Sequence, residues 1–187
     1  IKIMKSDGGI MSVNAAEEKP AYIVESGPAA GVIGASRTLA TQNCITLDMG
    51  GTTAKASIVE NGEVSRTGDY EVGAGINLAS KLVMGGGYAL KLPVIDISEI
   101  GAGGGSIVSV DRGGLVKVGP QSAGAFPGPA CYNLGGKEPT VTDANVFLGR
   151  LPEALAGGSL KLDKARASIV IEKIASQLGI SAVRAAL

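Results

Sequence analysis

The sequence predicts an α/β or α+β fold whose sheet is built largely from hairpins. Short runs of alternating apolar and polar residues are separated by turn signals rich in glycine, of which the chain has 29 among its 187 residues. Two longer stretches, residues 28–41 and 163–178, carry the start and stop signals of helices. The length corresponds to one domain that can bury a hydrophobic core.

The first half of the chain predicts short elements joined by tight turns. In order, we expect a hairpin at 1–13, a helical turn at 14–18, a strand at 22–24, a helix at 28–41, a buried strand at 44–47 and a hairpin of 55–59 with 63–70. Asp7 and the glycines after it turn the first hairpin, and Asn14 caps the helical turn that Pro20 ends. Asn61 and Gly62 form the strongest short hairpin signal in the chain.

The second half predicts a further hairpin and two helices. In order, we expect a strand at 94–100, a glycine-rich turn at 101–106, a hairpin of 107–110 with 115–118, an ordered loop at 119–136, a helix from 142 to about 151 and a helix at 163–178 with Ile169, Ile171, Ile174 and Leu178 on its apolar side. Thr142 and Asp143 cap the first helix, and Gly179 ends the second. We divide the chain into residues 1–156 and a C-terminal segment at 157–187, which consists of a linker that begins with two glycines and an amphipathic helix.

Composition excludes several kinds of function. The 17 basic residues balance the 17 acidic ones, so the composition does not predict a basic surface that would bind nucleic acid. The chain has no His, which rules out imidazole-based catalytic triads and His-ligated metals. No run of about 18 apolar residues is present that would cross a bilayer. Cys44 and Cys131 do not form a CxxC pair, and we expect both to be small buried hydrophobic residues.

The strongest chemical signal is the segment from Asp48 to Thr53, which lies between two predicted strands. Its glycines let the backbone approach an anion without a clash from Cβ, and its N–H groups and Thr hydroxyls can surround phosphate oxygens. The Asp48 carboxylate can hold hydrated Mg²⁺ or orient an attacking water. The alternative is a plain hairpin turn that Asp48 caps.

Other polar residues are open to two interpretations. The run containing Gly103 and Gly104 either approaches a ligand or packs as a tight turn between strands. We expect Lys55, two residues after the Asp48 turn, to lie on the solvated surface. The simplest interpretation of Asp143 is a helix cap. Cys131 has no neighbour in the sequence that would lower the pKa of its thiol.

The segment from Asp48 to Thr53 resembles the second phosphate motif of the actin, sugar-kinase and Hsp70 superfamily of ATPases. Five further segments resemble, in the same order, the hydantoinase A/oxoprolinase family: 26–31, 100–106, 119–125, 127–132 and 140–145. This resemblance spans about residues 7–151. It implies a ribonuclease H-like (actin-like) lobe with a mixed sheet, hairpins and flanking helices, and an internal segment of a longer enzyme.

Members of that family are ATP-dependent amidohydrolases that open hydantoins or 5-oxoproline. The resemblance implies ATP and Mg²⁺ as cofactors, with Asp48 as the catalytic and metal-binding residue. It implies that the cofactor contacts are Gly50, Gly51, Thr52, Thr53, Gly103 and Gly104. It also implies a cyclic amide substrate and a companion hydantoinase B-type subunit. The need for ATP and the absence of an export signal predict a cytoplasmic location. The balanced charge and the lack of a long apolar run predict that neither nucleic acid nor a membrane is a partner.

Two alternatives to the amidohydrolase stay open. One is the ATP-using subunit of an acetone- or acetophenone-type ketone carboxylase, and the other is a non-catalytic scaffold with an actin-like fold. In every case we expect this segment to be inactive by itself, because the other wall of the nucleotide cleft lies outside it. We also expect it to form homo-oligomers through apolar surface that the rest of the enzyme would cover.

Overall fold

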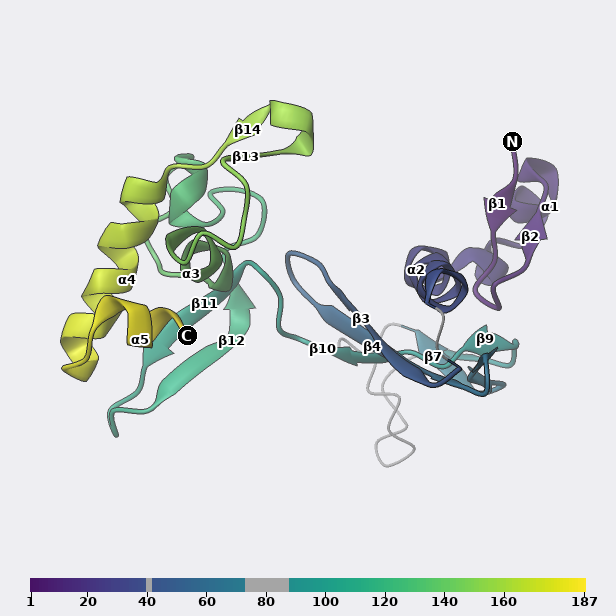
Figure 1. Cartoon of the computed structure of the whole chain (residues 1–187). Helices are drawn as coiled ribbons and strands as arrows, with labels where there is room; N and C mark the ends of the chain where they lie inside the picture. The colour runs from purple at the N-terminus through teal and green to yellow at the C-terminus, as the bar shows by residue number, and fades with distance from the viewer. Residues whose placement is uncertain (40–41, 73–87) are drawn as a thin grey trace. The chain divides into compact units, whose positions relative to one another are not determined.

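A computed structural model describes residues 1–39, 42–72 and 88–187 (Figure 1). It has a mixed α/β architecture in two compact units, one made of residues 1–48 and 54–100 and the other of residues 49–53 and 101–187. The turn at 49–53 therefore belongs to the second unit, although strands of the first unit flank it in the sequence. The boundary expected between residues 156 and 157 falls inside the second unit.

The first unit consists of short helices and of strands that pair in several small antiparallel sheets. Its elements are β1 (Ile3–Met4), β2 (Ile10–Met11), α1 (Val13–Glu18), the 3₁₀ helix η1 (Pro20–Ile23), α2 (Ser26–Thr38), β3 (Cys44–Met49, with Met49 assigned to the second unit), β4 (Ala54–Glu60), β5 (Glu63–Val64), β6 (Arg66–Thr67), β7 (Tyr70–Val72), β8 (Tyr88–Leu90), β9 (Val94–Ile95) and β10 (Ser98–Ile100).

The largest sheet of the described residues has the order β10–β4–β3, and β5 extends it by pairing with β4. The Asn61–Gly62 turn joins β4 to β5, and both residues have the positive φ that a tight hairpin turn requires, 53° and 77°. Helix α2 packs against this sheet through buried side chains. The core of the unit consists of Ala29, Val32, Val59, Val64 and Ile95.

The outer face of β3 is exposed. Cys44 packs against the core, whereas Ile45 and Leu47 are 74% and 69% exposed. Side chains alternate between the two faces of a strand, so the residues next to Cys44 and Thr46 point away from α2. The expectation of a buried strand at 44–47 is therefore wrong, because one face has no cover among the described residues. This outcome also leaves Cys44 only half-buried.

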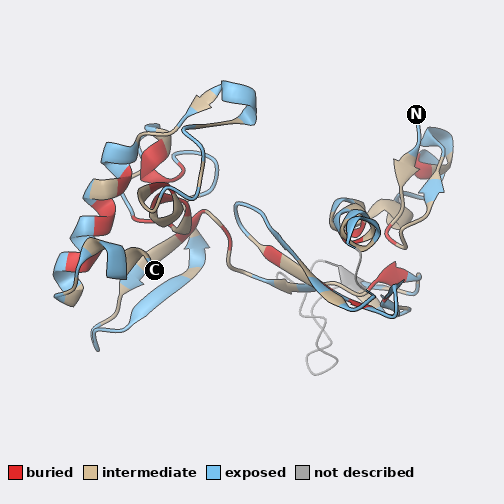
Figure 2. Cartoon of the chain, in the orientation of Figure 1, coloured by how far each residue is buried: buried red, intermediate tan, exposed pale blue. Residues whose placement is uncertain are grey.

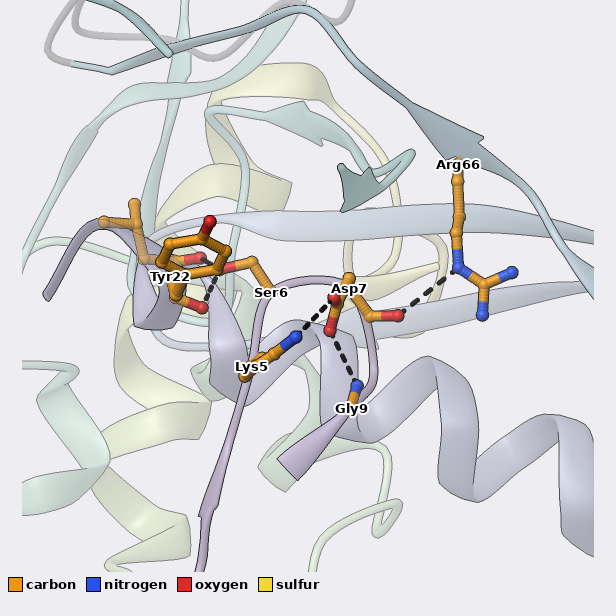
Figure 3. Close-up of polar contacts among 7 residues, drawn as sticks. Lys5, Ser6, Asp7, Gly9, Tyr22 and Arg66 are labelled. Atoms are coloured by element: carbon orange, nitrogen blue, oxygen red, sulfur yellow. Dashed lines mark hydrogen bonds and ion pairs between the residues drawn. The ribbon is translucent and has the colours of Figure 1, made fainter. Parts of the chain in front are cut away.

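Polar contacts fix the turn of the first hairpin (Figure 3). Lys5 Nζ lies 2.7 Å from Asp7 Oδ2 and 5.6 Å from the centre of the Tyr22 ring. The amide of Gly9 donates to Asp7 Oδ1 at 2.8 Å, and Arg66 Nε donates to the carbonyl oxygen of Asp7 at 3.3 Å. Burial alone would raise the pKa of Asp7, but the hydrogen bonds from Lys5 and Gly9 outweigh it and lower that pKa.

Three local predictions for the first unit need correction. Ser12, not Asn14, caps α1, because its side chain accepts from the amide of Ala15. Residues 22–24 do not form a strand, since Pro20 begins a 3₁₀ helix that extends to Ile23. The strand expected at 94–100 is divided into β9, which pairs with β6, and β10, which pairs with β4.

The second unit packs helices against a long hairpin. Its elements are β11 (Ser106–Val110), β12 (Val116–Ser122), the 3₁₀ helix η2 (Ala130–Tyr132), α3 (Val141–Phe147), β13 (Ala154–Leu155), the 3₁₀ helix η3 (Ala156–Gly158), β14 (Leu160–Lys161), α4 (Lys164–Leu178) and α5 (Ala182–Ala186).

Helix α4 provides much of the core of this unit (Figure 2). Asp163 caps its first turn by accepting from the amide of Arg166, and Gly179 ends it with φ at 66°, as predicted. Ile171 and Ile174 are buried as expected, but Ile169 is 65% exposed. Helical spacing explains the difference, because the buried positions recur every three or four residues and Ile169 lies between them. The buried residues of α4 are Ala167, Val170, Ile171, Ile174 and Ala175.

A buried carboxylate joins α3 to the loop before it. Asp143 has no exposed surface, and its Oδ2 accepts from the amide and the hydroxyl of Thr140 at 3.0 and 2.8 Å. Asp143 also accepts from the amide of Ala130 at 3.2 Å and from the amide of Cys131 at 2.8 Å. The helix cap is Thr140 and not Thr142 or Asp143; Asp143 completes a capping box as the third helical residue.

Two further elements of the second unit differ from expectation. Helix α3 ends at Phe147 and not near residue 151, since Gly149 follows with a left-handed φ of 71°. The two glycines at 157–158 are not a linker, because they turn the chain between the paired strands β13 and β14. Among the described residues, none of the helices is both long and apolar enough to cross a membrane.

The Asp143 network predicts a large loss of stability when its charge is removed. In Asp143→Asn, one oxygen becomes an NH₂ group that faces N–H and O–H donors, so we expect the free energy of unfolding to fall by about 3 kcal/mol. Urea denaturation of the intact protein measures this change. Asp163→Asn is the control, because Asn caps a helix about as well as Asp. Equal stability of the two variants would contradict this account of Asp143.

Candidate functional site

Asp48 lies near the end of β3 and is exposed to solvent. A Cβ added at Gly31 of α2 would lie 3.9 Å from its Oδ2 atom, so the carboxylate is on the side of β3 that faces α2. The small residues of α2 therefore leave space beside this carboxylate. Among the described residues, no hydrogen-bond donor or cation holds Asp48, which leaves both of its oxygens available to a ligand.

The next residues form a turn that belongs to the second unit. The amide of Gly50 donates to the carbonyl oxygen of Thr53 at 2.9 Å and closes the turn. The carbonyl oxygen of Gly50 accepts from the amide of Gly104 at 2.9 Å, and that of Gly51 accepts from the amide of Gly105 at 2.6 Å. The glycine-rich segment at 101–105 thus supports the turn through two consecutive hydrogen bonds.

Gly103 has no room for a side chain. A Cβ at this position would lie 2.7 Å from the backbone N and C atoms of Thr52 and 2.8 Å from the carbonyl oxygen of Gly50. Such distances are far below van der Waals contact, so only glycine allows the two backbones to pack at this spacing. The predicted site residues on the two glycine segments are therefore brought together in the second unit.

Two amide groups of the turn point away from this support. In a trans peptide, a carbonyl oxygen and the following N–H point in opposite directions. Because the carbonyl oxygens of Gly50 and Gly51 face the glycine segment, the N–H groups of Gly51 and Thr52 face the other way. Neither N–H has a hydrogen-bond partner in the part of the chain that the structure describes. Adjacent N–H groups of this kind form an anion-binding concavity.

The open side of the turn also has space for a ligand. Among the described residues, a Cβ added at Gly51 would meet no heavy atom within 4 Å, in contrast to the Cβ at Gly103. The amides of Gly103 and Gly104 do not face this space, because Gly103 N donates to Ser106 Oγ at 2.8 Å and Gly104 N donates to Gly50. These two glycines are in place to support the turn, and their amides are engaged within the protein.

Two side chains hold the glycine segment, and sequence reasoning missed one of them, Thr142. Ser106 is completely buried and accepts the hydrogen bond from Gly103. Thr142 donates from both its amide and its hydroxyl to the carbonyl oxygen of Gly104, at 2.7 and 2.8 Å. Thr142 is 38 residues beyond Gly104, and nothing in the local sequence distinguishes its hydroxyl from that of a helix cap.

A charged pocket in the first unit corrects the expectation for Lys55. Its Nζ atom lies 2.9 Å from Glu99 Oε1 and 3.9 Å from Glu25 Oε2, and its side chain is only 18% exposed. Lys55 and Glu99 are directly opposite each other on β4 and β10. Tyr70 lines the same pocket, and burial together with the charges of Glu25 and Glu99 raises the pKa of its hydroxyl. Lys55 is therefore part of a partly buried ionic cluster and not a solvated surface residue.

Cys131 is not suited to act as a nucleophile. It is fully buried, as predicted, and burial raises the pKa of its thiol, with a further increase from the nearby charge of Asp143. A thiol that stays protonated has little reactivity. Cys131 and Asp143 therefore belong to the packing of the loop at 127–132.

The described residues contain no group of three or more Cys, Asp or Glu side chains arranged to hold a metal ion. Asp48 would be a single protein ligand. Mg²⁺ commonly binds in this way, through one or two carboxylates, several waters and the phosphates of a substrate. The donor set thus fits Mg²⁺ that arrives with a phosphate ligand and does not fit a closed metal cage.

Comparisons with known proteins agree on one family. The Hydantoinase/oxoprolinase family model matches residues 1–187. The alpha subunit of a caprolactamase from Pseudomonas jessenii is 39% identical over 192 residues, which cover 100% of this chain and 26% of that protein. A 5-oxoprolinase from Saccharomyces cerevisiae is 42% identical over 155 residues, covering 81% of this chain and 11% of that protein.

Solved structures give the same result. The nucleotide-free structure of acetone carboxylase, an enzyme of ATP-dependent acetone carboxylation, matches with a TM-score of 0.74 and 30% identity, covering 100% of this chain and 25% of that one. The ATP-dependent caprolactamase from Pseudomonas jessenii matches with a TM-score of 0.70 and 37% identity, covering 99% and 26%. This chain thus spans about a quarter of the length of these proteins, and less of the 5-oxoprolinase.

The packing of the two glycine segments predicts a position-specific effect of a single methyl group. In Gly103→Ala the new Cβ meets backbone atoms of Thr52 and Gly50, so we expect a loss of about 3 kcal/mol in the free energy of unfolding. Gly68→Ala is the control, because a Cβ at Gly68 meets no heavy atom within 4 Å in the described part of the chain. Chemical denaturation of both variants measures the difference. An unaffected Gly103→Ala variant would show that the segments do not pack as described.

Proposed function

The chain belongs to the hydantoinase/oxoprolinase family, and from that premise we propose that it forms the phosphate-binding part of an ATP-dependent amidohydrolase that opens a cyclic amide. Relatives named for such reactions include the caprolactamase and the 5-oxoprolinase. The caprolactamase is ATP-dependent. The substrate of this protein would be a small cyclic amide of the same class as caprolactam, 5-oxoproline or a hydantoin.

The observation that carries the proposal is the pair of N–H groups at Gly51 and Thr52 that have no hydrogen-bond partner among the described residues. The carbonyl oxygens of the same two peptide groups accept hydrogen bonds from the amides of Gly104 and Gly105, so the two N–H donors are fixed before a ligand arrives. Donors that need no rearrangement stabilise a phosphoryl group as negative charge develops on it. The open space at Gly51 lets phosphate oxygens approach the backbone closely. In this proposal Thr52 and Thr53 add their hydroxyls to the same phosphate contact.

Asp48 supplies the acidic group of the proposed site. It directly precedes the turn in the chain, and its carboxylate is exposed. We assign it to Mg²⁺ that is bound together with the nucleotide, or to the water that attacks the activated substrate.

ATP would supply the phosphoryl group that converts the amide oxygen into a good leaving group, because an amide carbonyl alone is a weak electrophile. The role of this chain is then to bind and orient the phosphates. The proposed cofactors are ATP and Mg²⁺, and ATP use points to the cytoplasm. The proposed companion is a hydantoinase B-type subunit, in line with the subunit names of the relatives.

We also propose that the complete nucleotide-binding domain has a ribonuclease H-like, actin-like fold. The hairpin of β3 and β4 with a phosphate-binding turn at its tip supports this assignment, as does the resemblance of the Asp48–Thr53 motif. The other wall of the cleft would come from a further part of the enzyme. The chain by itself is then expected to be inactive.

A ketone carboxylase is the second candidate. The similarity to acetone carboxylase, with 30% identity over the whole chain, favours it specifically. Both reactions would use the same phosphate-binding turn, and the group that receives the phosphoryl would differ. The substrate that stimulates ATP hydrolysis separates the two.

The proposal is tested by ATP hydrolysis of the intact enzyme with its companion subunit. We expect caprolactam, 5-oxoproline or a hydantoin to stimulate ATP hydrolysis, and Asp48→Asn to lower the stimulated rate by about 100-fold or more, because loss of the carboxylate removes the metal or water contact. Asp69→Asn, at another exposed Asp, should leave the rate unchanged. Stimulation only by acetone or acetophenone with bicarbonate would favour the carboxylase, and absence of any ATP hydrolysis would favour the scaffold.

The turn itself is tested by Gly51→Ala. A methyl group at Gly51 enters the open space and blocks close approach of phosphate, so we expect the KM for ATP to rise by about tenfold. The melting temperature should stay unchanged, because the added Cβ meets no protein atom within 4 Å. Gly68→Ala again serves as the control. An unchanged KM for ATP would place the phosphates elsewhere.

A further inference from the structure

We infer that Thr142 is a positioning residue for the phosphate-binding turn and acts through a relay of hydrogen-bonded peptide groups. The inference rests on the proposed function, since it concerns how the same turn holds a phosphate. Thr142 lies in the first turn of α3 and is 7% exposed, so it cannot reach a ligand in solvent directly. Its effect would pass through two peptide groups.

The relay begins at the carbonyl group of Gly104. Both the amide and the hydroxyl of Thr142 donate to this oxygen, at 2.7 and 2.8 Å. The Gly104 carbonyl and the Gly105 N–H belong to one trans peptide and point in opposite directions. The Gly105 N–H donates to the carbonyl oxygen of Gly51 at 2.6 Å.

The relay ends at the open side of the turn. The Gly51 carbonyl shares a trans peptide with the N–H of Thr52, which faces the proposed phosphate site. Hydrogen bonds in such a chain polarise one another and strengthen each bond by about 10–30%. Together with the Thr142 amide, the Thr142 hydroxyl therefore fixes the orientation of the Thr52 N–H and makes it a better donor, without contacting the phosphate.

A second relay runs parallel to the first and contains main-chain groups only. Ser106 N donates to the carbonyl oxygen of Gly103 at 3.0 Å, and Gly104 N donates to that of Gly50 at 2.9 Å. The N–H of Gly51 is the outward end of this second relay. Thr142 is the side chain that donates to the first relay. Substitution of Thr142 can therefore change the first relay and leave the second in place.

The hydroxyl of Thr142 is not needed to cap α3. Thr140 performs that role, because its Oγ1 accepts from the amide of Asp143. The Thr142 hydroxyl also explains the glycine at 104, since a Cβ there would lie 2.7 Å from Thr142 Oγ1. Position and chemistry thus direct this hydroxyl to the glycine segment and not to the helix.

The test compares Thr142→Val with Thr142→Ser in the intact enzyme with its companion subunit. Val has nearly the shape of Thr without the hydroxyl, and Ser retains the hydroxyl. With Mg²⁺ and ATP as the probe, we expect Thr142→Val to bind ATP about fivefold more weakly, with a KM change larger than the kcat change, and Thr142→Ser to bind within about twofold of wild type. Hydrogen exchange of the peptide at 50–53 gives a second readout, in which ATP should protect Thr142→Val less than wild type.

Val146→Ala separates positioning from stability. Val146 is buried on the same helix, so this variant should lower the melting temperature at least as much as Thr142→Val and leave ATP affinity unchanged. If Thr142→Val does not fold, Thr142→Ala removes the hydroxyl without adding bulk near Gly104. Equal ATP affinity of wild type and the variants without the hydroxyl would overturn the inference. Absence of ATP binding and of protection at 50–53 in wild type would instead overturn the proposed function.

Discussion

Direct backbone contact between two glycine segments is the constraint on which the proposed phosphate site depends. The carbonyl oxygens of Gly50 and Gly51 are bound by the amides of Gly104 and Gly105, at distances that leave no room for a Cβ at Gly103. Because peptide groups are planar and trans, binding the carbonyls on one side sets the direction of the N–H groups on the other. The packing of the two glycine segments therefore determines the direction from which a ligand must approach the N–H groups of Gly51 and Thr52.

The rest of the second unit keeps this contact in place. Thr142 at the start of α3 holds Gly104, and Asp143 beside it binds the backbone of the loop that contains Cys131. The carboxylate is buried together with its donors, an arrangement that is costly to disturb because buried polar groups would be left without hydrogen bonds. Helix α4 covers this region with apolar side chains. The acidic residue that sequence reasoning assigned to a cap thus organises the support of the site.

Prediction from sequence succeeded where an element is determined by its own residues. The turn at Asn61 and Gly62 and the end of α4 at Gly179 follow from backbone conformations that few residues adopt. It failed where a distant residue decides the outcome. The local sequence predicts a surface position for Lys55, because its partner Glu99 lies 44 residues away in the chain. The Asp48–Thr53 motif can be recognised because its residues are consecutive in the sequence. Thr142 cannot, because its role depends on a tertiary contact with Gly104, 38 residues away.

The path of the chain through the two units limits how this protein can recombine with its relatives. The turn at 49–53 belongs with residues 101–187, although the strands on either side of it belong with the first unit. A crossover between homologous genes near residue 100 would unite a turn from one parent with a glycine segment from another. Such chimaeras would divide the second unit, because its turn and its glycine segment would come from different parents although their backbones pack without room for a Cβ. Exchange between family members is therefore expected to be tolerated best when both glycine segments are inherited together.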